Sequence, residues 1–182
     1  MLLLASKKIP THFVKRINDR EQLIKKCEII PIEFVVRNVA SGSICSRLGI
    51  KDGLKLKRPL LEYYLKEDSL DDPIVSRDHL ELFGWATKKE IEKIDQMSLK
   101  INHCLINHFK KKGITLVDFK IEFGRLSSNK KKIVLADEIS PDSCRLWDSK
   151  SKTKLDKDVF RKGIGNLIDA YEEVASRLGI MH

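Results

Sequence analysis

Alternating apolar and polar side chains predict a strand over residues 116–125. Asp118, Lys120 and Glu122 occupy every second position, and apolar residues fill the positions between them. Because successive side chains of a strand point to opposite faces, this order predicts one apolar face and one face that carries acid, base and acid. A polar, lysine-rich loop and a second apolar run that ends at Asp137 follow, so the whole segment is predicted to form a β-hairpin.

The register of this hairpin decides which charged side chains share a face. If residues 126–131 form the loop, Arg125 faces Lys132, and Asp137 then faces Lys120. Asp118, Lys120, Glu122 and Asp137 would then lie together on one face. A slip of a single residue would turn Asp137 to the other face, so the hypothesis depends on the pairing.

A helix-period apolar pattern predicts the longest helix, over residues 87–112. Thr87 and Glu90 have the spacing of a capping box at its start, and Gly113 is suited to end it. This segment therefore combines a start signal, a periodic apolar face and a stop signal.

A second helix is predicted over residues 156–178, with Asp156 as its cap. Gly163 and Gly165 weaken its first turns, so the pattern allows a break or an irregular start there. The apolar side chains expected to face inward are Phe160, Leu167, Ile168, Tyr171, Val174 and Leu178.

The N-terminal half is rich in strand-forming residues. Residues 28–37 predict two buried strand segments joined by a short connection at Pro31, because proline favours an edge or a joint. A small-residue turn then leads to a short helix, 44–48, for which Ser43 is the expected N-cap. A further strand is predicted over residues 60–65.

Composition restricts the class of protein. The chain has 182 residues, of which 42% are apolar and 34% charged, which is typical of a globular protein and not of a disordered one. No apolar run approaches the roughly 18 residues that span a bilayer, and the apolar start of the chain is too short for a signal peptide. The four cysteines form no CxxC pair, so neither a zinc site nor a disulfide framework is indicated. We therefore expect a cytoplasmic protein with reduced thiols and no membrane partner.

The net charge of +9 raises the possibility of a nucleic-acid partner. The basic residues are dispersed among acids, however, and the runs 110–112 and 130–132 fall at a helix end and in a loop. This pattern favours solvated faces and small anionic ligands over nucleic acid. The acidic loop 67–73 could ligate a hard cation such as Mg²⁺ or could be an ordinary soluble loop. Arg37 and the turn after it could hold a phosphate or form a plain helix cap.

Five ordered motifs carry a resemblance to a known family. They are VVRNVASGS at 35–43, DDP at 71–73, LVDFKIEFGR at 116–125, LADEISPDSCRLWD at 135–148 and LDKDVFRKGIGNLIDAYEEVASRLG at 155–179. Together they resemble the SAICAR synthetases (phosphoribosylaminoimidazole-succinocarboxamide synthetases) of purine biosynthesis, from Ile9 onward. The resemblance implies an α+β, two-lobed fold of the ATP-grasp or kinase-like kind and a homo-oligomer.

The resemblance also implies a reaction. In the family, an ATP-dependent ligase joins carboxyaminoimidazole ribotide to L-aspartate and releases ADP and phosphate. ATP is thought to activate the imidazole carboxylate as an acyl phosphate, which the aspartate amine then attacks. This chemistry asks the protein for charge neutralisation and positioning, supplied by acids that hold Mg²⁺ and by bases that hold phosphates.

Several residues match family positions on the ATP side of the site. Glu122 and Asp137 match the positions that hold the Mg²⁺ of ATP, in an arrangement similar to that of protein kinases. Lys120 matches a position near the transferred phosphate, and Asp118 matches a neighbouring active-site acid whose role is left open. The predicted connection from Glu28 to Ile30 matches the hinge whose backbone meets adenine.

Other residues match positions on the ribotide side. Arg37, Ser43 and Arg145 match residues that bind the ribotide, and two guanidiniums and a hydroxyl suit its phosphate. Asp72 and Glu33 match acids near the imidazole carboxylate, where a second cation can sit.

One family segment has no counterpart in this sequence. The family pattern normally begins with a small β-sheet that bears a glycine-containing loop of the form YEGKAK, which covers the ATP phosphates. We therefore expect residues 1–36 to be the remnant of an N-terminal ATP-binding lobe and residues 37–182 to form the C-terminal lobe. We expect the chain alone to bind ATP weakly and to turn over little or not at all. The alternative is a catalytically inactive fragment that binds the ribotide or forms oligomers.

Overall fold

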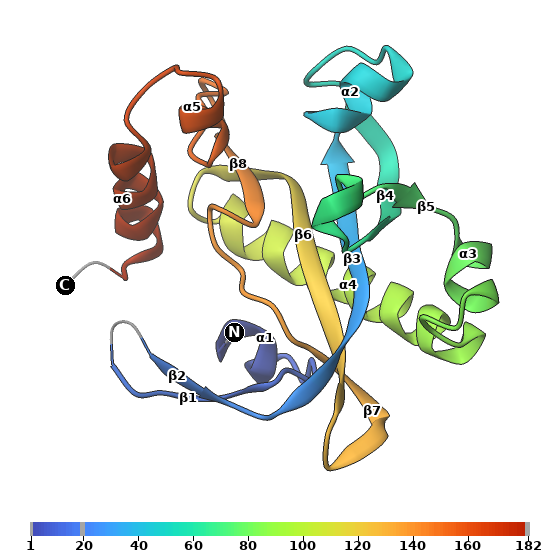
Figure 1. Ribbon diagram of the computed structural model, residues 1–182. Coiled ribbons are helices and arrows are strands. Elements are labelled where there is room, and N and C mark those ends of the chain that lie inside the picture. Colours follow the sequence, from blue (N-terminus) through green and yellow to red (C-terminus); the bar gives the residue numbers. More distant parts are fainter. Residues whose placement is uncertain (1, 19–20, 181–182) are drawn as a thin grey trace. The chain divides into compact units, whose positions relative to one another are not determined.

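A computed structural model describes residues 2–18 and 21–180 of the chain (Figure 1). The helices are α1 (Leu2–Ser6), α2 (Ser43–Leu48), α3 (Arg77–Leu82), α4 (Lys88–Lys110), α5 (Asp158–Arg161) and α6 (Leu167–Leu178), with a 3₁₀ turn, η1, at Asp68–Leu70. The strands are β1 (Phe13–Arg16), β2 (Gln22–Ile24), β3 (Cys27–Val39), β4 (Lys55–Leu65), β5 (Ile74–Val75), β6 (Ile114–Leu126), β7 (Asn129–Leu135) and β8 (Cys144–Asp148). This mixture is the α+β class that the sequence predicts.

The main sheet is built around two long strands, β3 and β6. Its order is β5-β4-β3-β6-β7, and β8 also pairs with β6, whereas β1 and β2 form a separate two-stranded sheet. Figure 1 shows β6 as one continuous strand; β8 runs antiparallel to its first half and β7 to its last residues. The strand that carries most of the predicted site therefore changes neighbours along its length.

The chain divides into two compact units. Unit 1 comprises the described parts of Met1–Val35, Leu61–Ile101 and Ile121–Glu138, and unit 2 comprises those of Val36–Leu60, Asn102–Lys120 and Ile139–His182. One boundary falls at residues 35 and 36, next to the predicted end of the N-terminal remnant. The division into an N-terminal remnant, 1–36, and a C-terminal lobe, 37–182, stays a prediction.

Each unit has its own apolar core. In unit 1, Phe34 packs edge-on against Tyr63 and Phe123, with ring centroids 5.7 and 5.3 Å apart. In unit 2, Val117 and Trp147 pack together with Val39, and all three are buried. These cores fix the strands from which the candidate site residues project.

The predicted break at Pro31 is wrong. The strand β3 runs without interruption through Pro31, so Glu28 to Ile30 lie within a strand and not in a connection. Pro31 has no N–H, but its carbonyl oxygen still accepts from the backbone N–H of Lys66 at 3.0 Å. The strand therefore keeps a ladder bond at the proline.

The predicted hairpin register is also wrong by one residue. Arg125 pairs with Ile133, not with Lys132, because the strands turn tightly at Ser127 and Ser128 and Leu126 pairs with Asn129. An irregularity in the register then places three lysines, 130–132, on β7 between two successive pairs. Asp137 lies beyond the end of β7, so strand alternation does not fix its face.

The predicted helices agree with the structure in part. The capping box of α4 is present, since Thr87 N donates to Glu90 and Glu90 N donates to Thr87 Oγ1. The C-terminal helix is broken into α5 and α6, and Asn166 caps α6 by accepting from Ile168 N at 2.9 Å. Phe160 and Ile168 are 73% and 65% exposed, so the prediction that both face inward is wrong.

Two smaller differences concern local boundaries. The N-cap position of α2 is Gly42 and not Ser43, and no side chain caps this helix. The strand predicted over 60–65 begins earlier, at Lys55. Among the residues that the structure describes, no helix combines the length and the apolarity needed to cross a lipid bilayer.

Candidate functional site

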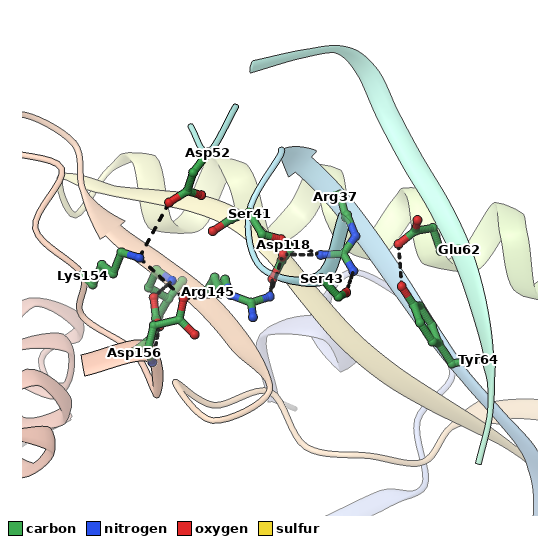
Figure 2. A network of polar contacts seen from close by, with 12 residues as sticks. Arg37, Ser41, Ser43, Asp52, Glu62, Tyr64, Asp118, Arg145, Lys154 and Asp156 are labelled. Carbon is green, nitrogen blue, oxygen red and sulfur yellow. Dashed lines mark hydrogen bonds and ion pairs between the residues drawn. The ribbon is translucent and has the colours of Figure 1, made fainter. Parts of the chain in front are cut away.

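Two arginines of unit 2 converge on one buried carboxylate (Figure 2). Arg37, near the end of β3, donates from Nη1 to Asp118 Oδ2 at 2.8 Å. Arg145, on β8, donates from Nη1 to Oδ1 and Oδ2 of Asp118 at 3.2 and 3.0 Å. Asp118 and Arg37 are each 3% exposed. We call Arg37, Ser43, Asp118 and Arg145 the arginine cluster.

The small-residue turn completes this cluster. Ser43 Oγ accepts from Arg37 Nη2 at 3.2 Å. Gly42 has a φ of 68°, and a Cβ there would lie 2.5 Å from Arg145 Nη2. A side chain at Gly42 would therefore displace the guanidinium, so this glycine serves both the turn and the close approach of Arg145. The structure thus brings together three residues that the sequence assigned to one ligand.

A second carboxylate holds Arg145 from the other side. Arg145 Nε donates to Asp158 Oδ2 at 3.1 Å, and Lys154 Nζ lies 3.7 Å from the same oxygen. Burial raises the pKa of Asp118, and the positive charges of Arg145 and Arg37 oppose that shift. Burial alone would lower the pKa of Arg145, but Asp118 and Asp158 raise it on balance. The two carboxylates therefore favour the charged form of the Arg145 guanidinium.

The acids predicted to hold Mg²⁺ lie in unit 1. Glu122 is 6% exposed, and its Oε1 accepts from Lys66 Nζ at 2.6 Å. Ala136 N donates to the backbone oxygen of Glu122 at 3.0 Å, and Asp137 is the residue that follows Ala136. We call Glu122 and Asp137 the acidic pair.

The electrostatic surroundings of the acidic pair include a histidine. Burial lowers the pKa of His12, and the charge of Asp137 opposes this. Across residues 2–18 and 21–180, no group of three or more His, Cys, Asp or Glu side chains is arranged to hold a metal ion. Any cation at the acidic pair would therefore need further ligands from a bound phosphate or from water.

The acidic loop has an unusual backbone. Asp71 and Asp72 have φ values of 59° and 44°, in a backbone region that residues other than glycine rarely adopt. Asp72 Oδ1 accepts from Glu67 N at 2.9 Å, so part of its carboxylate closes its own loop. Glu33 lies half-buried in the middle of β3.

The remaining predicted residues lie on β3 and β6. Lys120 is half-buried, and its backbone N–H donates to Ser143 O at 2.8 Å. Glu28 is exposed and lies 3.0 Å from Lys130 Nζ, whereas Ile30 is fully buried. The role of the Glu28–Ile30 backbone in adenine binding stays a prediction.

Sequence analysis missed three charged residues that contact the predicted site. Asp158 and Lys154 lie around Arg145, and Lys66 contacts Glu122. The segment LDKD contains Asp158 and belongs to one of the five motifs, which was a signal that could have drawn attention to it. Lys66 stands in no motif, and only the folded chain brings it to Glu122.

Two convergent guanidiniums beside a small-residue turn offer the type of donor that suits a small anionic ligand. Comparison with known proteins makes the class specific. The family model for SAICAR synthetase matches residues 1–178. The chain belongs to the SAICAR synthetase family.

Curated relatives support this assignment over nearly the whole chain. A phosphoribosylaminoimidazole-succinocarboxamide synthase from Pelagibacter ubique is 62% identical over 175 residues, which are 96% of this chain and 67% of the relative. The enzyme of the same name from Acidiphilium cryptum is 58% identical over 174 residues, 95% of this chain and 68% of the relative. The chain is therefore similar to about two thirds of the length of these enzymes.

Solved structures have the same fold. The crystal structure of a phosphoribosylaminoimidazole-succinocarboxamide synthase from Ehrlichia chaffeensis superposes with a TM-score of 0.97 at 50% identity, over 100% of this chain and 77% of that one. A SAICAR synthetase in complex with ADP gives a TM-score of 0.93 at 45% identity, over 97% and 75% of the two chains. The predicted family, fold and activity are confirmed: the activity is that of an ATP-dependent ligase of purine biosynthesis.

Proposed function

We propose that the arginine cluster binds the phosphate of carboxyaminoimidazole ribotide. The observation that carries this proposal is the convergence of Arg37 and Arg145 on Asp118, with Ser43 Oγ 3.2 Å from Arg37 Nη2. A guanidinium offers paired N–H donors in a geometry that suits phosphate oxygens, and the hydroxyl adds another donor. Asp118 and Asp158 both pair with these guanidiniums, so the phosphate would bind through N–H groups that the carboxylates leave available and through the Ser43 hydroxyl.

In this proposal, Asp118 positions the arginines and does not act on the reacting atoms. Its two oxygens accept three hydrogen bonds from Arg37 and Arg145, so they hold both guanidiniums in place before the ligand arrives. Such preorganisation lowers the cost of ordering side chains upon binding. This gives a definite role to the acid whose role the sequence left open.

We further propose that Glu122 and Asp137 hold the Mg²⁺ that accompanies ATP. The donor set fits this ion, which is commonly bound by one or two carboxylates together with substrate phosphates. The ammonium of Lys66, 2.6 Å from Glu122 Oε1, occupies a place that suits a cation. Bound there, Mg²⁺ would neutralise phosphate charge, and Lys120 would offset the charge of the transferred phosphoryl group.

The remaining roles follow the family pattern. The imidazole carboxylate takes the terminal phosphoryl group of ATP and releases ADP; the amine of L-aspartate then attacks the acyl phosphate, and phosphate leaves. We assign Asp72 and Glu33 to the surroundings of the imidazole carboxylate and the backbone from Glu28 to Ile30 to adenine.

We also propose that the protein forms a homo-oligomer in the cytoplasm. Light scattering of the purified chain tests its assembly state.

We propose that residues 1–182 by themselves bind ATP weakly and turn over slowly, because they include no YEGKAK-like loop to cover the ATP phosphates. The test is ADP release by the purified chain with ribotide and L-aspartate, beside an intact family member. Turnover near that of the intact enzyme contradicts the proposal.

The second candidate function is ribotide binding without catalysis, and the arginine cluster favours it because it lies wholly within the present chain. Titration calorimetry separates the two candidates. Ribotide binding that Ser43→Ala weakens, without measurable ATP binding, supports the second. ATP binding and ADP release together support the first.

A further inference from the structure

Unit 2 contains a cavity of about 770 Å³ that the proposed reaction does not use. Its volume lies within the range of small-molecule sites, roughly 300–1,000 Å³. The end of β3, the second half of α4, the start of β6 and the end of β8 contribute to its lining, together with the loop around Asp52 and the loop from Ser149 to Lys154.

Among the described residues, the cavity lining and the arginine cluster have no residue in common. Arg37 points its guanidinium at Asp118, whereas the next residue, Asn38, exchanges amide hydrogen bonds with Asn102 of α4 at 2.8 and 2.9 Å. Val39 and Trp147 also line the cavity, and each follows an arginine of the cluster by two residues, so strand alternation does not separate the two sites. The cavity differs from the proposed ribotide site in its lining, which contains no described residue of the arginine cluster.

One wall of the cavity is apolar and includes an aromatic ring. Val39, Ile114, Leu116 and the indole of Trp147 line it, and all four side chains are at least nine-tenths buried. Trp147 Nε1 has no hydrogen-bond partner among the described residues. Lys154 Nζ lies over the indole, 5.7 Å from the ring centroid, and the aliphatic side chains supply the rest of a wall that suits a flat ring.

The rim of the cavity is basic. Lys55, Lys110 and Lys152 line it from three different elements, and each is exposed. The one carboxylate in the lining, Asp52, lies 3.9 Å from both Lys154 and Lys162, and Figure 2 shows Lys154 reaching it. The positive charge of the other three lysines is therefore available to an anion that carries more than one negative charge.

We propose that this cavity binds a mononucleotide, with its base against the Trp147 wall and its phosphate at the lysine rim. The cavity combines the two features that such a ligand needs, an apolar wall beside several cations, in a volume of suitable size. The proposal assigns the chain a ligand site beyond those proposed above, and it does not depend on the roles proposed for the arginine cluster or the acidic pair.

Tryptophan fluorescence and calorimetry test the proposal with AMP as the probe. The chain has two tryptophans, so Trp85→Phe leaves Trp147 as the only one and makes its emission a report on the cavity. We expect AMP to change this emission with a single saturation curve. Adenosine and inorganic phosphate, which each supply half of the ligand, are expected to bind at least about tenfold more weakly.

Variants show where AMP binds. The double variant, with both Lys55→Ala and Lys110→Ala, is expected to raise the Kd for AMP about tenfold or more. Lys93→Ala, which removes a charge from α4 outside the cavity lining, is the matched control and is expected to leave the Kd unchanged. Ser43→Ala is likewise expected to have no effect, because Ser43 belongs to the arginine cluster. Unchanged thermal unfolding of each variant shows that it is folded.

Three results would overturn the proposal. The first is the absence of saturable AMP binding at millimolar concentration. The second is AMP binding that Ser43→Ala abolishes and the double lysine variant leaves intact, since the nucleotide would then occupy the arginine cluster. The third is inorganic phosphate binding as tightly as AMP, because the apolar wall would then contribute nothing.

Discussion

The arginine cluster and the acidic pair balance their charges in different ways. In the arginine cluster, Arg37 and Asp118 are buried, the Arg145 side chain is 14% exposed, and the three charged groups satisfy one another at 2.8 to 3.2 Å. At the acidic pair, the buried Glu122 contacts Lys66, whose side chain is 45% exposed. The arginine cluster is preorganised by ion pairs inside the protein. At the acidic pair, the ammonium of Lys66 can move into water.

This difference has a physical consequence for ligand binding. A buried ion-pair network loses much stability when one member is removed, because the remaining charges have no water to solvate them. An ion pair with one exposed partner contributes little and is readily exchanged. The arginine cluster should therefore resist change in the free protein, whereas the acidic pair should readily accept another cation.

The largest effect is expected from Asp118→Ala. It leaves Arg37 and Arg145 buried beside each other without their shared carboxylate, and we expect the free energy of unfolding in urea to fall by about 3–5 kcal/mol. The matched control is Glu28→Ala, which removes a carboxylate 55% exposed and 3.0 Å from Lys130 Nζ. We expect this control to cost less than about 1 kcal/mol. Equal losses for the two variants would show that burial does not distinguish the two kinds of pair.

The second prediction concerns the close approach of Gly42 to Arg145. Gly42→Ala adds a Cβ 2.5 Å from Arg145 Nη2 at a φ of 68°, whereas Gly49→Ala has a similar φ of 62° with no atom within 4 Å. We expect Gly49→Ala to destabilise the protein by about 1 kcal/mol through backbone strain alone. Gly42→Ala should cost about 2–4 kcal/mol, because overpacking adds to the strain. Equal unfolding midpoints would mean that Arg145 moves aside freely.

The third prediction concerns Asp156, which lies beside the arginine cluster in unit 2. Asp156 is fully buried, and burial raises its pKa to about 6, although it accepts from the N–H groups of Leu146 and Asp158. Because the folded pKa exceeds the unfolded value of about 3.9, the folded state binds the proton more tightly. This contribution to stability is fully present below about pH 4 and is lost as the pH rises through about 6.

Asp156→Asn isolates this contribution, since asparagine does not titrate. We expect the difference in unfolding free energy, native protein minus variant, to fall by about 2–3 kcal/mol between pH 4 and pH 7. Taking the difference removes groups that respond in the opposite direction, such as Glu90, whose pKa Arg125 lowers to about 2. A difference that stays constant over this range would show that Asp156 titrates normally.

Local signals in the sequence predicted the local structure well. The capping box of Thr87 and Glu90 and the apolar period after it specify α4, because hydrogen bonds and packing within one helix are encoded in neighbouring residues. The hairpin also lies where the alternation predicted it, but its observed register differs from the predicted one by one residue. The three lysines, 130–132, that the irregular pairing places on β7 have the same polar character as a loop, so composition could not separate the two.

Contacts between distant residues could be reached only through the family resemblance or not at all. Asp118 is 81 residues from Arg37 and 27 from Arg145, and no periodicity relates them. The five motifs nominated all three, whereas Lys66 lies outside every motif and was missed. Exposure of Phe160 and Ile168 was missed for a related reason, since the break between α5 and α6 changes which face each residue presents.

The smallest effect is expected from Lys66→Met, which tests whether another cation can replace Lys66 at the acidic pair. Removing the ammonium 2.6 Å from Glu122 Oε1 leaves a buried carboxylate that favours another cation. We expect Mn²⁺, a spectroscopic probe that accepts the same oxygen ligands as Mg²⁺, to bind about threefold to tenfold more tightly to the variant in paramagnetic resonance titrations. The gain is modest because water screens the exposed end of Lys66.

Lys130→Met is the matched control for this titration, since it removes an exposed lysine that pairs with Glu28. Its Mn²⁺ affinity should equal that of the native chain, and Glu122→Gln added to Lys66→Met should abolish the gain. If Lys66→Met leaves Mn²⁺ binding unchanged or weakens it, Lys66 does not compete with a cation at Glu122. Lys66 and Glu122 would then form an ion pair that does not exchange with other cations. The contrast between the acidic pair and the arginine cluster would be lost.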